Sequence, residues 1–165
     1  MQNLSSTQIG VIAVNHVANA LMISSKGRFS IYSPVADDDG LDLLIYDKLS
    51  GHAFPIQVKS RTRTIRKRGS KEPGNVTHFE IKKKAYREER YAYAVLVLLS
   101  EDAASVERAW LLPMRELKKY ASERREKYVF RPSKVQYTND RYTQLQCEDL
   151  NELGKRLLDE IKEKG

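Results

Sequence analysis

The chain has 165 residues, of which 41% are hydrophobic and 31% charged, with a net charge of +7, so we expect one globular domain spanning residues 1–165 rather than a disordered segment. No run of about 18 apolar residues is present and residues 1–6 lack a signal-peptide pattern, which argues against a membrane protein. The single cysteine, Cys147, excludes an internal disulfide, no Cys/His spacing typical of zinc occurs, and we expect a cytoplasmic protein.

The first part of the chain predicts a helix, an extended segment and a hairpin. Ser5 followed by Gln8 fits a capping box, and apolar residues then recur at 3.6-residue spacing until Gly27, a natural stop. Residues 28–35 are expected to be extended. Alternating apolar residues predict two strands, joined by a turn at residues 48–51. These strands are expected over residues 41–46 and 54–59.

A concentrated positive segment follows the hairpin. Residues 59–71 contain seven cations and no acid, whereas charges of opposite sign are mostly interleaved elsewhere. Such a segment attracts polyanions by counterion release, which favours nucleic acid. A charge run is also often only a solvated, mobile loop, so taken alone it is a weak indication. The cations are Lys59, Arg61, Arg63, Arg66, Lys67, Arg68 and Lys71.

The second half of the chain predicts alternating strands and helices. The segment 93–99 is apolar enough for a strand buried on both faces, and Pro113 is placed where a helix would begin. A charged helix is expected over residues 82–90. Leu153 and Leu157 belong to the apolar stripe of a final amphipathic helix. Further strands are expected over residues 76–81, 108–112 and 128–131, the last of them at an edge. This order predicts an α/β domain with a central mixed sheet flanked by helices.

Polar side chains interrupt the two apolar strands of the hairpin, in the segment GLDLLIYDKLSGHAFPIQVKS (residues 40–60). Asp42 lies between two leucines. Gln57 and Lys59 flank Val58, so their side chains point to the same face of the second strand. If the strands pair through the turn, the three polar groups can converge at one end of the sheet.

This set of groups suits phosphodiester hydrolysis. The scissile phosphate is anionic, so the site needs a hard cation to neutralise charge and activate water. Magnesium prefers oxygen ligands and keeps several waters, so the Asp42 carboxylate, the Gln57 amide oxygen and the Val58 carbonyl form a candidate ligand set for Mg²⁺ or Mn²⁺. Lys59 would stabilise the developing charge on the phosphate or orient the attacking water.

The pattern G-x-D-L, a hairpin, then hydrophobic-Q-V-K-S resembles the Mrr-type and Holliday-junction-resolvase-like branch of the PD-(D/E)xK nuclease superfamily. The resemblance covers roughly residues 8–120, including the first helix, the strand over 93–99 and the Trp110–Pro113 step. It implies a restriction-endonuclease-like core, with Asp42 as the metal-binding aspartate, Lys59 as the catalytic lysine and Gln57 at the acidic position of the D/E-x-K element.

The sequence departs from the family pattern at two positions. Gln57 brings no negative charge. The family's first helix usually carries a glutamate that faces the metal, and the matching position here is Val14 or Asn15, of which Asn15 is the better polar substitute. With one carboxylate, the metal affinity is expected to be weaker than in a member that has the full pattern.

Each candidate residue also has a simpler interpretation. Asp42 can cap a turn, Gln57 can be an ordinary strand residue, and Lys59 can be the first residue of the basic segment. The place of Asp42 inside an apolar strand and the Q-x-K spacing at Lys59 favour the functional interpretation of these two residues. In that context the cations beyond Lys59 would contact the nucleic-acid backbone. The candidate contact residues are Arg61, Arg63, Arg66, Lys67 and Arg68.

The leading hypothesis from the sequence is a magnesium-dependent DNA endonuclease. An alternative is a degenerate, non-cleaving member that keeps the fold as a DNA-binding or assembly module, and a third is a fold that serves only protein interaction. Salt-insensitive or absent DNA binding would indicate the third, since phosphate contacts weaken with salt. Nucleases that cut both strands often pair, so a homodimer stays open, although no interface can be identified in the sequence.

Overall fold

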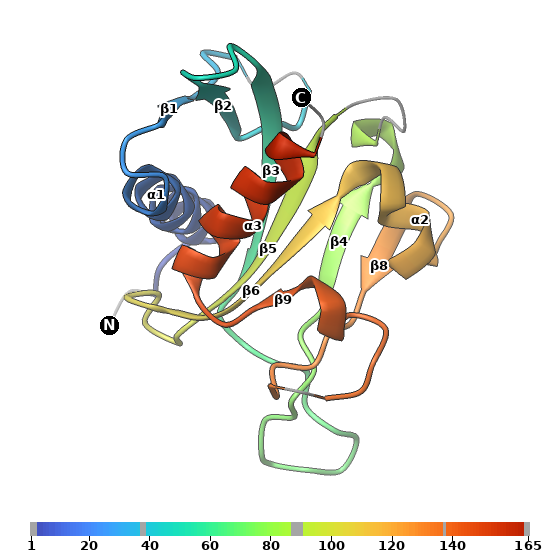
Figure 1. Cartoon of the computed structure of the whole chain (residues 1–165). Helices are drawn as coiled ribbons and strands as arrows, with labels where there is room; N and C mark the ends of the chain where they lie inside the picture. Colours follow the sequence, from blue (N-terminus) through green and yellow to red (C-terminus); the bar gives the residue numbers. More distant parts are fainter. Residues whose placement is uncertain (1–2, 37–38, 87–90, 137, 164–165) are drawn as a thin grey trace.

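The computed structural model describes residues 3–36, 39–86, 91–136 and 138–163, arranged around a six-stranded sheet (Figure 1). The order in this sheet is β1-β2-β3-β5-β6-β9, and a second, three-stranded sheet has the order β4-β8-β7. The elements in chain order are α1 (Ser6–Ser24), β1 (Phe29–Tyr32), β2 (Leu43–Asp47), β3 (Ala53–Arg61), β4 (Phe79–Lys82), the 3₁₀ turn η1 (Lys83–Ala85), β5 (Tyr93–Leu99), β6 (Val106–Pro113), η2 (Met114–Glu116), α2 (Leu117–Tyr120), β7 (Ser122–Glu123), β8 (Lys127–Phe130), η3 (Thr143–Leu145), β9 (Gln146–Cys147) and α3 (Leu150–Lys162).

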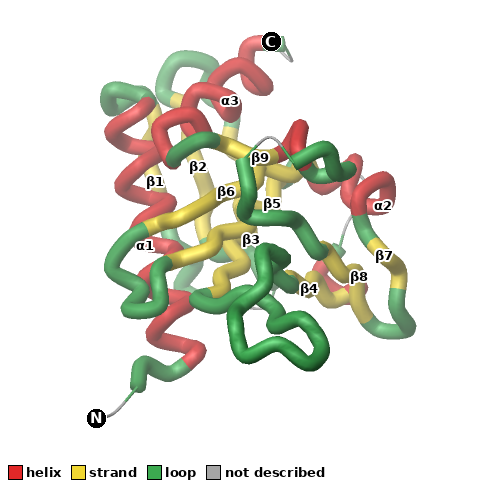
Figure 2. Tube along the Cα trace, turned by 90° about the horizontal axis from the view of Figure 1, so that it is seen from below, coloured by secondary structure: helices red, strands yellow, loops and turns green. Residues whose placement is uncertain are grey.

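The main sheet separates two hydrophobic cores. Its strands are antiparallel except for the parallel pair β3–β5, so the sheet is mixed. Helices α1 and α3 pack together on one face, with Ile56, Val58 and Val95 in their core. The β4-β8-β7 sheet and α2 cover the other face, with Leu96 and Trp110 in theirs. Figure 2 shows these layers on either side of the sheet. The prediction of an α/β domain with a mixed sheet flanked by helices is confirmed.

Helix α1 begins as the sequence predicts. The Ser5 side chain accepts the Gln8 N–H at 3.2 Å, and the Gln8 side chain accepts the Ser5 N–H at 2.8 Å, which completes the capping box. By length and composition α1 alone among the described helices could cross a membrane. That property is weak support for a span, because a core helix shares it. In α1, Ala13, Val17 and Leu21 are buried in the first core, and 22% of the apolar window is buried in total.

The predicted hairpin is present, with shifted boundaries. Strand β2 begins at Leu43, so Asp42 lies one residue before the strand rather than inside it. The Asp42 N–H nevertheless donates to the Ile56 carbonyl at 2.9 Å, which keeps the chain next to β3 at this point. The register pairs Leu43 with Ile56 and Ile45 with Phe54, so the apolar residues of both strands face the first core.

Two predictions in the second half are wrong. Of the charged helix expected over residues 82–90, the structure has only the 3₁₀ turn η1, after which Tyr86 is extended; residues 87–90 lie outside the described part. Tyr86 instead packs edge-to-face on Tyr128, with ring centroids 5.3 Å apart. Strand β8, expected at an edge, is central in the second sheet because Phe130 and Tyr128 pair with Phe79 and Ile81 over the second core.

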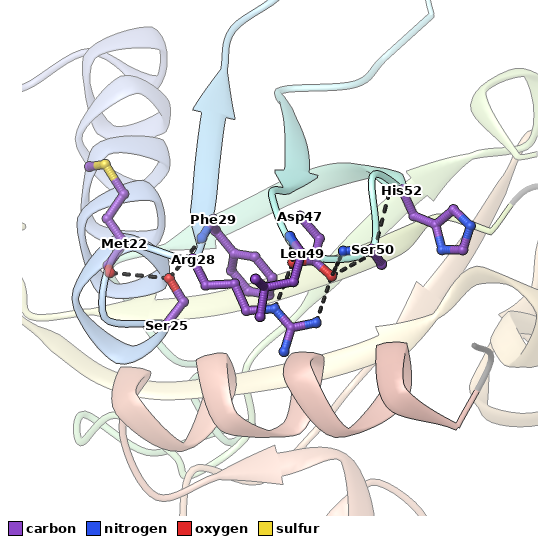
Figure 3. Close-up of polar contacts among 8 residues, drawn as sticks. All are labelled: Met22, Ser25, Arg28, Phe29, Asp47, Leu49, Ser50 and His52. Atoms are coloured by element: carbon purple, nitrogen blue, oxygen red, sulfur yellow. Dashed lines mark hydrogen bonds and ion pairs between the residues drawn. The ribbon is translucent and has the colours of Figure 1, made fainter.

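A buried ion pair fixes the β1–β2 end of the sheet (Figure 3). Arg28 donates from Nε and Nη2 to the two carboxylate oxygens of Asp47, both at 2.6 Å. The same carboxylate accepts the Leu49 N–H, the Ser50 N–H and the Ser50 hydroxyl, and its side chain is fully buried. These contacts, led by the Arg28 hydrogen bonds, hold the pKa of Asp47 well below its usual range. The cluster therefore anchors the turn between β2 and β3.

Candidate active site

Asp42, Gln57 and Lys59 lie on neighbouring positions of the β2–β3 pair. Because Leu43 pairs with Ile56, the preceding residue Asp42 lies beside Gln57. Alternation along β3 turns Gln57 and Lys59 away from the α1–α3 core that receives Ile56 and Val58. The structure therefore brings the three predicted residues to one region of the sheet face that carries the β4-β8-β7 layer.

The Asp42 carboxylate is held by the backbone of β3. Its Oδ2 accepts the Val58 N–H at 2.6 Å. A carboxylate has about four lone-pair positions, and this bond fixes the orientation of the group. The N–H and C=O of a strand residue point to the same edge, and the Val58 carbonyl therefore faces the Asp42 side of β3. Carboxylate and carbonyl oxygens are thus directed to one place.

Gln57 contributes a buried amide oxygen that lacks a partner. The residue is only 3% exposed, and its Oε1 forms no hydrogen bond in the described part of the chain. Leaving such an atom unsatisfied costs about 1–3 kcal/mol, so a buried amide oxygen normally has a partner, which can be a water molecule or a ligand. The Gln57 oxygen is therefore available to a group from outside the chain.

Gly40 and Ala85 wall this region; the G-x-D-L pattern of the sequence includes Gly40, whereas Ala85 was not indicated by the sequence. Gly40 has a φ of +69°, a conformation that favours glycine, and a Cβ there would lie 3.2 Å from the Ala85 Cβ and 3.3 Å from the Gln57 Nε2. The loop before β2 and the η1 turn after β4 therefore close around the Gln57 side chain. The glycine directly before the L-D-L motif was the only signal in the sequence.

Lys59 is half-buried, and its ammonium group has no hydrogen-bond or ion-pair partner among the residues described. It pairs in register with Leu96 of β5, a residue of the second core, so its stem lies along apolar surface. A lysine that is partly desolvated and unpaired is a positive point charge ready for an anionic ligand.

The oxygen donors fit a hard divalent cation. Mg²⁺ takes oxygen ligands, keeps several waters and is often bound through one or two carboxylates. Asp42, the unsatisfied Gln57 oxygen and the Val58 carbonyl form such a set. Among the described residues no group of three or more His, Cys, Asp or Glu side chains could hold a metal. The carboxylate count is therefore low, as the sequence indicates.

The remaining predicted residues lie outside this group. Asn15 is exposed on α1, the helix that packs on the opposite face of the sheet, and its role as a polar substitute stays a prediction. Arg61 ends β3 and is exposed. Arg63 forms an exposed ion pair with Glu101, at 3.3 Å. Exposed side chains are found at Arg66, Lys67 and Arg68.

Comparison with known proteins gives matches among solved structures. No protein-family model matches the chain, and no curated protein matches it. The bacterial homing endonuclease I-Ssp6803I superposes with a TM-score of 0.62 at 17% identity, covering 98% of this chain and 99% of that one. The fold is restriction-endonuclease-like. Hjc, a Holliday junction resolvase of Archaeoglobus fulgidus, matches at 11% identity and a TM-score of 0.44, over 82% of this chain and 96% of its own.

The restriction-endonuclease-like fold confirms the family resemblance at the level of the fold. At 17% identity, agreement of this kind concerns the backbone and does not extend to residue roles. The roles of Asp42, Gln57 and Lys59 therefore depend on the geometry of this chain.

Proposed function

We propose that the protein is a metal-dependent DNA endonuclease whose active site is formed by Asp42, Gln57 and Lys59. The observation that carries the proposal is the buried, unsatisfied Gln57 oxygen beside the oriented Asp42 carboxylate. Lys59, half-buried on the same strand as Gln57 and without an ion-pair partner among the described residues, would supply the positive charge that phosphoryl chemistry needs. The restriction-endonuclease-like fold agrees with this class of activity.

Asp42, the Gln57 amide oxygen and the Val58 carbonyl would hold Mg²⁺ or Mn²⁺. A bound divalent ion of this kind neutralises charge on the scissile phosphate and lowers the pKa of water. Asp42 would be kept in position by the Val58 N–H. Lys59 would place its ammonium group against the phosphate oxygens and stabilise the negative charge that develops there. We assign both residues a direct role in catalysis.

The substrate in this proposal is DNA, bound in part through the exposed cations beyond Lys59. Arg61 and Arg63 follow Lys59 directly in the chain, so they would contact phosphates near the scissile bond. In this proposal residues 1–165 form a single nuclease domain that acts in the cytoplasm. Pairing of two copies would allow both strands to be cut.

The test is cleavage of supercoiled, linear and branched DNA with Mg²⁺ or Mn²⁺. Wild type should nick the DNA only in the presence of metal, and Asp42→Ala and Lys59→Ala should each abolish the activity. Glu126→Gln is the matched control, because Glu126 is exposed, pairs with the exposed Arg125, and lies outside both the site and the basic segment. If the folded wild type never cuts any of these substrates, the proposal is wrong.

A second candidate function is a non-cleaving DNA-binding module. The low carboxylate count among the described residues favours it, because a cation would be held weakly. In that case the wild type binds DNA with a strong salt dependence, and neither substitution changes the binding by more than its charge effect. Metal-dependent cleavage that Asp42→Ala abolishes would exclude this candidate.

A further inference from the structure

Residues 62–76 form an arm of two antiparallel segments that lie side by side and are joined by a few backbone contacts. The Ile65 N–H donates to the Val76 carbonyl at 2.7 Å and the Gly74 N–H to the Ile65 carbonyl at 3.0 Å. Arg66 and Pro73 pair as an antiparallel bridge. The tip turns where the Ser70 N–H donates to the Lys67 carbonyl at 3.0 Å.

Glycines allow the turn at the tip and the close approach of the two strands. Gly69 has a φ of +78° in the turn, which glycine adopts without strain. A Cβ at Gly74 would lie 2.5 Å from the Ile65 carbonyl oxygen, so only glycine lets the returning strand approach this closely. Glycine is therefore suited to the turn at position 69 and to the close approach at position 74.

The base of the arm is fixed to the second layer. The Thr77 N–H donates to the Pro132 carbonyl at 2.9 Å, and the Lys134 N–H donates to the Asn75 carbonyl at 2.7 Å. Val76 and Ser133 form a further antiparallel bridge. In Figure 1 the arm extends beyond the lower end of the sheet, in continuation of β3. It is an anchored projection that begins a few residues after Lys59.

The distal part of the arm carries exposed positive charge. None of its cations forms an ion pair within the described part of the chain, and Glu72 is the one acid between residues 62 and 76. The segment contains no aromatic residue. The exposed cations of the distal part are Arg66, Lys67, Arg68 and Lys71.

We infer that this arm enters the major groove of double-stranded DNA beside the cut site. The inference rests on the proposed function for its choice of DNA. A major groove about 12 Å wide admits a two-stranded β-ribbon, and the two antiparallel segments of the arm are of that size, whereas the minor groove is about half as wide. Arginine and lysine on such a ribbon reach the acceptor edge of guanine and the flanking phosphates. The arm therefore contacts base edges in the major groove, while Arg61 and Arg63 contact the phosphate backbone of the DNA.

The chemistry of the arm also selects against two other nucleic acids. Single-strand binding depends on bases stacking on aromatic side chains, which the arm lacks. Duplex RNA has a deep, narrow major groove that side chains cannot enter. The inference therefore predicts that the protein prefers duplex DNA to single-stranded DNA and to duplex RNA, and the experiment below tests this preference.

The test measures equilibrium binding without divalent metal, so that no cleavage occurs. The probes share one sequence: plain duplex DNA, duplex DNA with bulky groups on pyrimidine C5 in the major groove, single-stranded DNA and duplex RNA. The arm variant combines Arg66→Gln, Lys67→Gln, Arg68→Gln and Lys71→Gln. A control variant of equal charge change combines Lys48→Gln, Arg125→Gln, Lys155→Gln and Lys162→Gln, all exposed and outside the arm.

Wild type and control should bind plain duplex at least about tenfold more tightly than the C5-modified duplex. The arm variant should bind both duplexes equally. In the arm variant the slope of log K against log salt concentration should be smaller in magnitude by up to about 4, one for each lost cation. Equal binding of plain and modified duplex by the wild type overturns the inference, as does a preference for single strands or duplex RNA. The wild-type comparison needs no variant, so a folding defect cannot obscure the result.

This outcome is separable from that of the proposed nuclease activity. A protein that cuts plain and C5-modified duplex equally well in Mg²⁺ keeps the nuclease proposal and loses the groove contact. A protein that discriminates the two duplexes but never cuts keeps the groove contact and loses the nuclease.

Discussion

The Asp42 carboxylate accepts the backbone N–H of Val58 at 2.6 Å, across the two strands that carry the candidate site. One hydrogen bond thus links the aspartate to the residue between Gln57 and Lys59. Strand pairing ends at this point, because β2 begins at Leu43, and the aspartate side chain takes over the role of the next ladder partner. The same hydrogen bond therefore closes the end of the hairpin and orients the carboxylate of the site.

Substitution of Asp42 should separate these two roles. Asp42→Asn keeps an oxygen that can accept the Val58 N–H but removes the charge, so we expect near-native stability and a loss of metal-dependent cleavage of at least about 100-fold. Asp42→Ala also removes the acceptor and should lower the free energy of unfolding by about 1–3 kcal/mol. Urea unfolding and DNA nicking measure the two effects. Cleavage retained in the Asn variant would contradict the assigned role.

Substitution of Gln57 should affect activity and stability in opposite directions. Gln57→Met replaces a buried, unsatisfied amide oxygen by an apolar chain of similar size, so we expect stability unchanged or raised by about 1–3 kcal/mol, together with loss of cleavage. The matched control is Gln146→Met, since Gln146 is also buried but donates to the Ser133 carbonyl at 3.4 Å. That variant should be destabilised by about 0.5–1.5 kcal/mol and keep its activity. A marked loss of stability in Gln57→Met would assign this glutamine to the fold instead.

The sequence predicts well those elements whose pattern is local. The capping box of α1, the alternation of the β2–β3 hairpin, the apolar β5 and the stripe of α3 each follow from residues close together in the chain. The same alternation places Gln57 and Lys59 on one face. It could not show that the Gln57 oxygen is unsatisfied, because that depends on the distant Gly40 and η1 segments.

The second sheet could not be predicted because its pairing is distant. Its strands are only 2–4 residues long, and β4 pairs with β8 from nearly 50 positions further along the chain. Residues 82–86 have good helix formers among their lysines, but Tyr86 packs on Tyr128 and the Lys83 N–H donates to the Glu126 carbonyl. Tertiary contacts of this kind override a weak local helix propensity.

The Arg28–Asp47 pair should make stability depend on pH. The pKa of Asp47 in the folded protein lies below its unfolded value of 3.8, so the stabilisation is fully present well above that pH and is lost as the pH falls below about 4. Asp47→Asn should lower the urea midpoint at pH 7, and the gap from wild type should narrow between about pH 4 and pH 2. Glu101→Gln, which breaks the exposed Arg63 pair, should change the midpoint little at any pH. A gap that is constant with pH would show that the Asp47 charge is not the stabilising feature.

Gly154 should be required for the contact between α3 and α1. A Cβ at this position would lie 1.7 Å from the Ser24 Oγ and 2.6 Å from the Ser24 Cβ, distances that demand movement of a helix. Gly154→Ala should therefore destabilise the protein by about 1–3 kcal/mol, although alanine is the better helix former. Gly10→Ala is the matched control, because nothing lies within 4 Å of a Cβ there and the substitution should stabilise α1 by about 0.5–1 kcal/mol.

A compensating change at Ser24 tests the cause of the Gly154 effect. Ser24→Gly removes the two atoms that would clash with a Cβ on Gly154 and leaves only the Ala20 carbonyl oxygen, at 3.9 Å, so the double variant should regain most of the stability that Gly154→Ala alone loses. Urea unfolding of the two single variants and the double variant gives the interaction energy between the positions. If the two losses simply add, the helices are not held apart by this contact, and the need for glycine at position 154 has another origin.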